Sequence, residues 1–544
     1  AVCETEAFKA ALRVFGPKRL LWGGDFPVTE MRGRCVTTGD RFFWLHPEII
    51  DKQYQAPTDS AFTLIGIESL LTLQESCEDA GLNRSDIEDI FLNNALRLLQ
   101  PHLPAYANTL AVDNKKLWQS AKSVIAGGTG LLSKRSEQFN AEWPTFFSKS
   151  SGCEVWDLNG RKYIDCAGGI GAVLLGYGDE DVSKAVTRRL TLGTYSSLVN
   201  PQELELAEKL LQLHPWAGKV RYARTGGEAM SVAVRIARAA SGKSVVAFCG
   251  YHGWHDWYLA ANLGETNALD GHLLPGLQPK GVPRELTGTA VPFRYNDWQS
   301  FEAAVNKLGD NCGVVVMEPM RSQFPENDFL QKIRSFCSGK NIVMVVDEIT
   351  SGLRYGYPGA LTRYNVVPDI VIYAKAMSNG IPFATVIGND DVMTAADESF
   401  ISSSYWTDGI GTAAALAVLE KMESENVFNA VWSKGVALQE LLREIAMKYV
   451  SCGLVVGGMP ASPTFTFTSS HAAAARKLFI TRMQEEGFLV AGIFYLMHAH
   501  KEQHLHRFAE AFEQTLQLIE RSIESGIIET DNSKAFQHGF TRLA

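Results

Sequence analysis

Two short β-branched runs constrain the fold of this chain more than any other feature, because each leads directly into a reactive side chain. The run from Ile342 to Val346 ends at Asp347, and the run from Ile370 to Tyr373 is closely followed by Lys375. Apolar runs of this length and composition are typical of buried strands in a parallel sheet. Open α/β sheets bind ligands at the carboxyl ends of their strands, so we expect Asp347 and Lys375 to meet at one site.

Short strands alternate with helices from about residue 180 to residue 400, which is the sequence form of a doubly wound α/β sheet. Before this region, EVWDLNGRKYID predicts two strands joined by a hairpin at Asn159-Gly160. After about residue 410 a helix, AAALAVLEKM, leads to a mixed region with the strand TFTFT and to a closing helix, HLHRFAEAFEQTLQLIERSI. The sequence therefore predicts a central sheet with smaller elements before and after it.

Composition argues against several classes of protein. The 544 residues carry a net charge of −9 with no basic stripe, which argues against nucleic-acid binding. No apolar stretch approaches the roughly 20 residues needed to span a membrane. The nine cysteines are scattered, odd in number and without the spacing of metal ligands. We therefore expect a reduced, cytoplasmic protein without a bound metal.

Lys375 lies in VIYAKAMSNG, at the end of a predicted buried strand, where a merely solvated surface charge is not expected. Desolvation lowers the pKa of a lysine and so favours the free amine that attacks an aldehyde. Asp347, in IVMVVDEIT, is either a helix cap or a carboxylate that keeps the nitrogen of a pyridine ring protonated. An amine that forms an imine and a carboxylate that holds a ring nitrogen are the pair that pyridoxal phosphate (PLP) requires.

A phosphate site is predicted by RTGGEAMSVAVRIARAASG, in which Thr225, Gly226 and Gly227 precede a helix. Free backbone amides at the amino terminus of a helix bind phosphate, and glycines permit its close approach. Two glycines before a helix can also be a simple turn. The motif that follows, CGYHGWHDWY, favours the phosphate site.

Two further motifs follow predicted strands of the same sheet. Tyr251 and His252 come after the predicted strand from Val245 to Phe248, and an aromatic ring there either stacks on the pyridine ring or belongs to the core. His252 and His255 have no cysteine or carboxylate spacing that indicates a metal. Glu318, in VVVMEPM, ends another strand, and we place it near the cofactor.

Together these stretches resemble the class III PLP-dependent aminotransferases, and most closely the group that includes glutamate-1-semialdehyde aminomutase. The resemblance runs from about Leu117 to Gly526. It is carried by EVWDLNGRKYID, TGGEAMSVAVRIARA, YHGWHDW, DEITSGLR, PDIVIYAKAMSNG and SSSYWTDGIGTAAALAVL. It implies the type I PLP fold, with a mainly parallel seven-stranded large domain at residues 179–400. The smaller α+β domain would come from residues 105–178 and 401–544.

The resemblance also assigns roles to individual residues. Lys375 would be the internal-aldimine lysine, Asp347 the partner of the ring nitrogen, and Tyr251 the aromatic ring stacked on the cofactor. Thr225-Gly226-Gly227 would be the phosphate loop, and Ile349 would pack on the opposite ring face in place of the family's valine. Ser404 takes the place of a threonine that reaches the phosphate from the neighbouring subunit, which implies a homodimer with shared active sites.

Three motifs depart from their usual form in the family. Gly227 removes one hydroxyl from the phosphate loop, Ala374 replaces the glycine before the lysine, and Thr407-Asp408-Gly409 replaces Gly-Asn-Pro. Backbone amides still bind phosphate without the hydroxyl, so the prediction of PLP is kept.

The activity implied is transfer of an amino group from an amino acid donor to a carbonyl acceptor, by a ping-pong reaction with Lys375 as general base. Arg135 and Arg354 are candidates for binding a substrate carboxylate, and either could instead form a structural salt bridge. An intramolecular aminomutase of the glutamate-1-semialdehyde type uses the same machinery and stays open as an alternative.

Residues 1–104 form a separate unit, which opens on AVCETEAFKAALRVFG as though the chain began partway through a longer protein. The stretch FGPKRLLWGGDFPV and the helical tail SDIEDIFLNNALRLL resemble the carboxyl-terminal end of an amidohydrolase (β/α) barrel, whose last strand delivers an aspartate, here Asp25. One strand cannot close a barrel, and a lone aspartate is not a metal site. We expect a mostly helical structural appendage; a metal-dependent hydrolase acting through Asp25 is the alternative.

Overall fold

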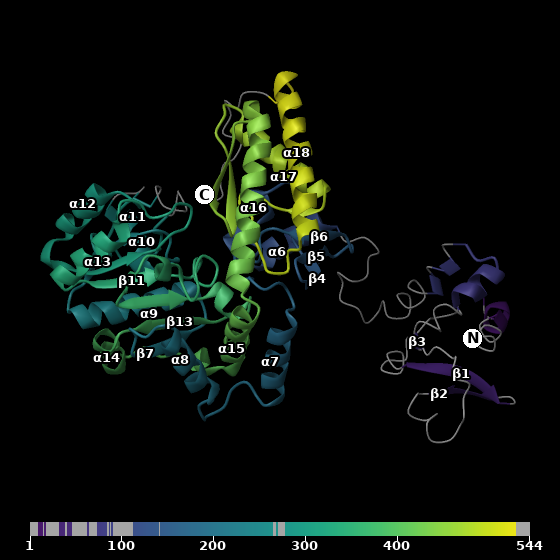
Figure 1. Ribbon diagram of the computed structural model, residues 1–544, viewed down its shortest axis with the longest axis horizontal. Helices are drawn as coiled ribbons and strands as arrows, with labels where there is room; N and C mark the ends of the chain where they lie inside the picture. Colours follow the sequence, from purple (N-terminus) through teal and green to yellow (C-terminus); the bar gives the residue numbers. More distant parts are fainter. Residues whose placement is uncertain are drawn as a thin grey trace. The chain divides into compact units, whose positions relative to one another are not determined.

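The computed structural model divides the chain into two compact units, Ala1–Val112 and Asp113–Ala544 (Figure 1). In the first unit it describes residues 9–14, 16–17, 73–83, 86–87 and 89–90, and the backbone of three strands. In the second it describes residues 113–140, 142–264, 268–269 and 278–528. The candidate site lies entirely in the second unit.

The described part of the first unit contains strands as well as helical segments. Strand β1 (Arg32–Thr38) pairs antiparallel with β2 (Arg41–Leu45) and β3 (Thr63–Leu64). Residues 9–14 and 73–79 are helical. The prediction of a mostly helical appendage therefore missed a sheet, whose aromatic run RFFWL favours a strand over a loop. Asp25 lies outside the described residues.

The second unit is built on a mainly parallel seven-stranded sheet, which confirms the predicted architecture. Only β13 runs antiparallel to its neighbours. The strand order is β7 (Lys219–Ala223), β13 (Ala384–Gly388), β12 (Ile370–Tyr373), β11 (Val343–Asp347), β10 (Cys312–Met317), β8 (Val245–Cys249) and β9 (Ala290–Pro292). Every residue of the four strands from β13 to β10 in that order is buried, as expected for β-branched runs in a sheet covered on both faces.

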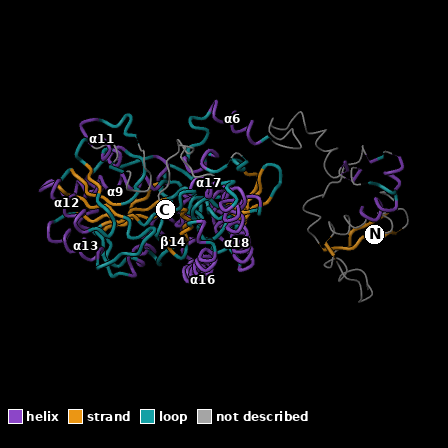
Figure 2. The backbone as a smooth tube through the Cα atoms, turned by 90° about the horizontal axis from the view of Figure 1, so that it is seen from above, coloured by secondary structure: helices purple, strands orange, loops and turns teal. Residues whose placement is uncertain are grey.

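Helices cover both faces of this sheet. Side chains alternate along a strand, so β10 sends Val314 and Val316 to one face and Val315 and Met317 to the other. The first face packs on helix α9; the second packs on α12 and α13. The helices of this domain are α9 (Gly226–Ser241), α10 (Asp256–Leu259), α11 (Ala261–Gly264), α12 (Trp298–Leu308), α13 (Phe329–Lys340) and α14 (Asp390–Glu398). Figure 2 shows the strands in orange among these helices.

A second, smaller sheet joins segments far apart in the sequence. Its order is β16 (Phe488–Leu489), β6 (Lys162–Asp165), β5 (Glu154–Asp157) and β4 (Phe147–Ser151). The predicted hairpin is confirmed, since β5 and β6 pair antiparallel, with Gly160 in the left-handed region at φ 78°. β16 pairs parallel with β6.

The remaining elements surround this small sheet or flank the large one. A two-stranded sheet, β14 (Leu454–Met459) and β15 (Ser462–Phe467), lies beside the long helices (Figure 1). The helices are α6 (Asn114–Val124), α7 (Glu180–Thr191), α8 (Gln202–Leu213), α15 (Gly409–Ser424), α16 (Val427–Lys448), α17 (Ala472–Glu485) and α18 (Glu502–Glu524). In the described stretches of the chain, none of the helices is long and apolar enough to cross a membrane.

Candidate active site

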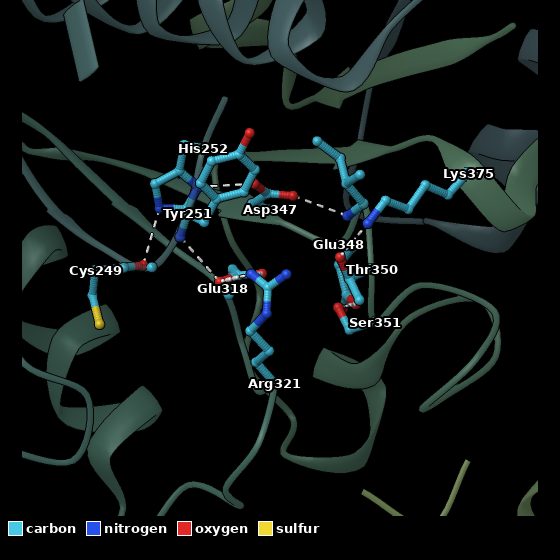
Figure 3. Close-up of polar contacts among 12 residues, drawn as sticks. Cys249, Tyr251, His252, Glu318, Arg321, Asp347, Glu348, Thr350, Ser351 and Lys375 are labelled. Atoms are coloured by element: carbon cyan, nitrogen blue, oxygen red, sulfur yellow. Dashed lines mark hydrogen bonds and ion pairs between the residues drawn. The ribbon is translucent and has the colours of Figure 1, made fainter. Parts of the chain in front are cut away.

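Four strand ends bring the predicted residues to one edge of the large sheet. β11 ends at Asp347, β12 is followed by Lys375, β10 is followed by Glu318, and β8 is followed by Tyr251 and His252. These strands are mutually parallel neighbours, so their carboxyl ends meet at the same edge. Figure 3 shows the resulting cluster.

Asp347 is buried, only 3% exposed, and both of its oxygens have partners. Its Oδ1 accepts the amide N–H of Ile349 at 2.9 Å, and its Oδ2 lies 2.8 Å from Nδ1 of His252. The other ring nitrogen of His252, Nε2, lies 3.0 Å from the carbonyl oxygen of Cys249, which can only accept. Both ring nitrogens of His252 therefore have partners, and the imidazole is held at both edges. A carboxylate paired in this way is held in place in the core.

Lys375 adopts a backbone conformation that is unusual for a residue with a side chain. Its φ is 49°, in the left-handed region, which costs about 1–2 kcal/mol for a residue other than glycine. It follows β12 and opens a short 3₁₀ turn, Lys375–Ser378, whose other three residues are buried. Its Nζ donates to the hydroxyl of Thr350 at 3.0 Å. The packed turn thus holds the lysine against the segment that follows Asp347, and such strain is concentrated at functional sites.

Glu318 lies at the end of β10 and binds the Tyr251 loop. Its Oε2 accepts the Tyr251 amide at 3.2 Å. Arg321, three residues later, donates through Nη1 to both oxygens of Glu318, at 2.7 and 2.8 Å. The arginine balances the buried carboxylate, and Figure 3 shows it on the far side of Glu318 from His252. Sequence reasoning missed Arg321, whose only signal was its position three residues after the strand-end glutamate.

The predicted phosphate loop forms the amino terminus of α9. Thr225 caps the helix, accepting the Glu228 amide at 3.4 Å, while the Glu228 carboxylate accepts the amides of Arg224 and Thr225 at 2.8 and 3.4 Å. The amides of Gly226 and Gly227 have no partner within the described part of the chain. They are the orphaned donors that an anion can satisfy at a helix amino terminus.

Gly226 brings this helix terminus against the Asp347 strand end. A Cβ built on Gly226 would lie 2.9 Å from Cδ1 of Ile349, two residues after Asp347. The orphaned amides, the Ile349 side chain and the Asp347 carboxylate thus adjoin one another, with Lys375 on the next strand. A phosphate would fit the orphaned amides, one face of a pyridine ring would fit the Ile349 side chain, and the protonated ring nitrogen would fit the Asp347 carboxylate. An aldehyde on that ring would meet Lys375. The residues present therefore fit PLP.

A second buried carboxylate, Glu348, was not singled out from the sequence. It is 1% exposed and accepts hydrogen bonds from the Ser351 hydroxyl and, at 3.0 Å, from the Leu361 amide. Burial raises its pKa from 4.5 to about 7. It joins the end of β11 to the loop that precedes β12. In the sequence, only the position of Glu348 next to Asp347 marked it as a candidate. No local pattern indicated that both carboxylates would be buried.

The two candidate arginines lie in different surroundings. Arg354 is fully buried, lies over the Tyr495 ring at 5.3 Å, and donates only to backbone oxygens. Those acceptors are the carbonyls of Leu496 at 2.6 Å and of Gly171 and Val173 at 3.2 Å each. Its hydrogen bonds therefore tie two distant segments together.

Arg135 is half-buried and lies between two 3₁₀ turns near the start of the second unit. Its guanidinium lies against Gly127, where a built Cβ would be 2.1 Å from Nη2. Ser404 is exposed at the start of the 3₁₀ turn Ser404–Thr407. Among the contacts of the described residues, none joins Arg135 or Ser404 to the Asp347 cluster. In the same part of the chain, no group of three His, Cys, Asp or Glu side chains is arranged to hold a metal.

This chain is similar to known proteins over most of its length. The model of the class-III aminotransferase family matches residues 136–516. The 3-aminobutyryl-CoA aminotransferase of Cloacimonas acidaminovorans (strain Evry) is 26% identical over 422 residues, which cover 75% of this chain and 97% of the relative. The glutamate-1-semialdehyde 2,1-aminomutase of Francisella philomiragia is 31% identical over 349 residues, 62% of this chain and 79% of the relative.

The fold has solved counterparts. The PLP internal aldimine form of the FumI protein from Sphingopyxis sp. MTA144 matches with a TM-score of 0.68 and 22% identity, covering 76% of this chain and 97% of that chain. The family match spans well over half of the sequence and contains every described residue of the Asp347–Lys375 cluster. This chain therefore belongs to the class-III aminotransferases, which use PLP to transfer amino groups.

Proposed function

We propose that Lys375 and Asp347 are the catalytic residues of this aminotransferase, and that it moves an amino group from an amino acid donor to a carbonyl acceptor. The observation that carries the proposal is the meeting of three features at one sheet edge. These are the strained Lys375, the Asp347–His252 pair and the orphaned amides of α9. Each suits a different part of PLP.

Seven further residues would hold the cofactor or the groups that contact it. The amides of Gly226 and Gly227, with the cap Thr225, would bind its phosphate. Tyr251 would cover one face of the ring and Ile349 the other, while Glu318 holds the Tyr251 loop and His252 holds Asp347 in place. PLP, when bound, supplies a ring that accepts the electrons of a bond broken at the substrate's α-carbon.

The chain's own groups then act on protons and charge. Asp347 would keep a positive charge on the ring nitrogen, and its carboxylate oxygens have lone pairs left for that contact beside the Ile349 amide and His252. Lys375 Nζ would take the proton from the donor's α-carbon and deliver it to the bound cofactor within the first half-reaction, and in the second half-reaction it would move a proton in the opposite direction, onto the carbon of the acceptor. The Thr350 hydroxyl, 3.0 Å from Nζ, positions the amine between these steps.

An exposed apolar surface supports a homodimer with shared active sites. Segments 190–204 and 400–409 meet where the Thr194 carbonyl accepts the Gly409 amide and where the rings of Tyr195 and Tyr405 lie 5.8 Å apart. Large apolar side chains on them are exposed, and such patches mark interfaces. They are Leu190, Leu192, Tyr195, Leu198, Val199, Leu204, Phe400 and Tyr405. Ser404 lies in this surface, so we propose that it reaches the phosphate of the partner subunit.

The test is a screen of amine donors and carbonyl acceptors, read out by the visible spectra of the two cofactor forms and by release of a keto acid. Wild-type protein should convert between the forms and release one keto acid per donor consumed, and Lys375→Ala should lose the borohydride-reducible visible band. If the alanine variant kept that band, the lysine assignment would be wrong. Conversion of one amino acid into its isomer without keto acid would instead establish an aminomutase, the alternative favoured by the similarity to glutamate-1-semialdehyde 2,1-aminomutase.

The same screen bears on the substrate. We propose Arg135 ahead of Arg354 as the carboxylate-binding residue, because three backbone carbonyls already occupy the Arg354 guanidinium. If the wild-type protein prefers donors with a second carboxylate and Arg135→Gln loses this preference, the result supports the role of Arg135. If the preference is unchanged in Arg135→Gln, the role of Arg135 is wrong.

Three broader proposals follow from the sequence. The domain limits are 105–178 with 401–544 for the small domain and 179–400 for the large one. The seven cysteines at described positions are buried free thiols, which supports a reducing, cytoplasmic setting; cell fractionation tests it. Residues 1–104 resemble the end of an amidohydrolase barrel, and the alternative is a metal-dependent hydrolase that acts through Asp25. Metal analysis tests this alternative, which is supported only if the protein binds a metal that Asp25→Ala removes.

A further inference from the structure

A buried nitrogen with no hydrogen-bond partner lies beside the amino terminus of α9. It is Nδ1 of His255, which has no partner among the described residues. His255 directly precedes α10 and is not part of the Asp347–His252 pair. A buried polar atom left unpaired costs about 1–3 kcal/mol, so an orphan of this kind indicates a partner that the chain itself does not supply.

The His255 ring edge lies against the first turn of α9. A Cβ built on Gly227 would lie 3.3 Å from Cε1 and 3.4 Å from Nδ1 of His255. A Cβ on Gly253 would lie 3.0 Å from the Cα of Gly227, and Gly253 itself has a φ of 102°. Glycine at both positions therefore lets the loop and the helix terminus approach this closely. A side chain at position 227 would fill the space that His255 faces.

Trp254 fixes the plane of this ring without using its nitrogens. The two rings stack with centroids 4.2 Å apart and planes 20° from parallel. Stacking uses the face of the imidazole and leaves its edge for hydrogen bonding. Burial lowers the pKa of His255, with the nearby Glu228 and Asp256 carboxylates opposing that effect. A neutral ring carries one proton, and Nδ1 donates when that proton is on it.

Donors therefore gather at this helix terminus, since Nδ1 of His255 lies beside the Cβ position of Gly227, and the amides of Gly226 and Gly227 are orphaned. We propose that His255 donates through Nδ1 a hydrogen bond to the cofactor phosphate at the amino terminus of α9. The histidine would replace the hydroxyl that Gly227 removes from the phosphate loop. This assignment rests on the proposed use of PLP, and it makes His255 a cofactor-binding residue supplied by a different loop.

The test compares PLP with pyridoxal, which has the same aldehyde and ring but no phosphate. Apoprotein is titrated with each compound, and binding is followed by visible absorbance and protein fluorescence. In His255→Ala the Kd for PLP should rise roughly tenfold, as expected for a hydrogen bond to a charged group, while the Kd for pyridoxal stays unchanged. His255→Asn, whose side-chain amide lies near the position of Nδ1, should recover most of the PLP affinity.

Two further variants keep the test independent of folding. His255→Phe retains the stack on Trp254 and removes only the nitrogens, so it should reproduce the selective loss for PLP even where alanine disturbs the loop. His506→Ala, at an exposed position on α18, is the matched control and should bind both compounds normally. The phosphorus NMR shift of bound PLP should change in His255→Phe and not in His506→Ala.

The outcomes separate this inference from the proposed function. If the His255 variants lose affinity for PLP and for pyridoxal equally, or lose affinity for neither, His255 does not bind the phosphate. The inference then fails while the PLP assignment stands. If wild-type protein binds neither compound, the proposed use of PLP fails and takes this inference with it. Selective loss for PLP with recovery in His255→Asn supports it.

Discussion

Asp347 shows how burial and pairing set the chemistry of one side chain. Its carboxylate is enclosed by the Ile349 amide and by His252, whose opposite nitrogen is held by the Cys249 carbonyl. Because both ring nitrogens have partners, the imidazole is held at both edges. The aspartate is therefore already oriented for the role proposed for it, and orientation of this kind costs no reorganisation during a reaction.

Replacing this charge should reduce catalysis more than stability. Asp347→Asn keeps the shape and the contact with the Ile349 amide but cannot stabilise a protonated ring nitrogen. We expect the rate of the first half-reaction to fall roughly 100-fold or more, with circular dichroism unchanged. Rapid-scanning absorbance after mixing with a donor measures this rate, and a near-normal rate would contradict the role of Asp347.

Glu348, next to Asp347, should make the stability of the fold depend on pH. Its pKa is raised from 4.5 to about 7 by burial, so the folded protein holds this proton between those values while the unfolded chain releases it. The free energy of unfolding should therefore fall as pH rises from 4.5 to 7, by about 3 kcal/mol at most.

Glu348→Gln should remove that part of the pH dependence. Urea unfolding at pH 4.5 and pH 8 measures it, with Glu440→Gln on an exposed position of α16 as control. An equal pH dependence in wild type and Glu348→Gln would show that Glu348 ionises in its ordinary range.

At the scale of elements, the contact between α9 and the end of β11 joins the proposed phosphate loop to the proposed ring site. Gly226 permits it, since a methyl group there would press on Ile349 at 2.9 Å. Gly226→Ala should displace Ile349 and raise the Kd for PLP several-fold, with little change in the free energy of unfolding because the moved atom is the flexible end of a side chain.

The matched control for this substitution is Gly339→Ala. Gly339 lies in α13 with nothing near its Cβ position, so alanine should stabilise the helix by up to about 1 kcal/mol and leave PLP binding unchanged. Fluorescence titration with PLP measures both variants. Equal affinity in Gly226→Ala and wild type would show that Ile349 does not touch the ring.

At the scale of the whole molecule, each unit has an apolar core of its own. Leu12, Leu73, Cys77 and Ile90 cluster within the first unit, while the three large clusters are made of residues from the second. A chain starting at Asp113 should therefore fold, bind PLP and retain its donor range. Circular dichroism and PLP titration test this, and insolubility of the shortened chain would show that the first unit is needed for folding.

The proposed sharing of active sites predicts complementation between subunits. Ser404→Asp should weaken PLP binding by placing a negative charge near the partner's phosphate, and Lys375→Ala should abolish turnover. In mixed dimers, the intact lysine of one subunit would meet the intact serine of the other. Unfolding and refolding the two variants together should restore up to about a quarter of wild-type activity if hybrids form statistically and one site in each is intact. No recovery in verified mixed dimers would place Ser404 in its own subunit's site or in none.

Local patterns in the sequence determined which segments are buried and where each strand ends. β-Branched runs cannot remain exposed, and a parallel sheet aligns its carboxyl ends, so Lys375, Asp347, Glu318, Tyr251 and the loop at Gly226 could be assigned to one edge. The glycines before α9 and the hairpin at Gly160 were readable for the same reason, because backbone geometry there depends on a few adjacent residues.

Tertiary structure alone decided which side chains pair across the fold. His252 meets Asp347, Arg354 meets carbonyls of two distant segments, Glu348 is enclosed by a later loop, and His255 faces Gly227. No local pattern specifies these partners, since each contact joins segments whose approach is set by packing of the whole sheet and its helices. The sequence alone therefore determined the chemistry at the sheet edge, and packing decided which neighbours orient it.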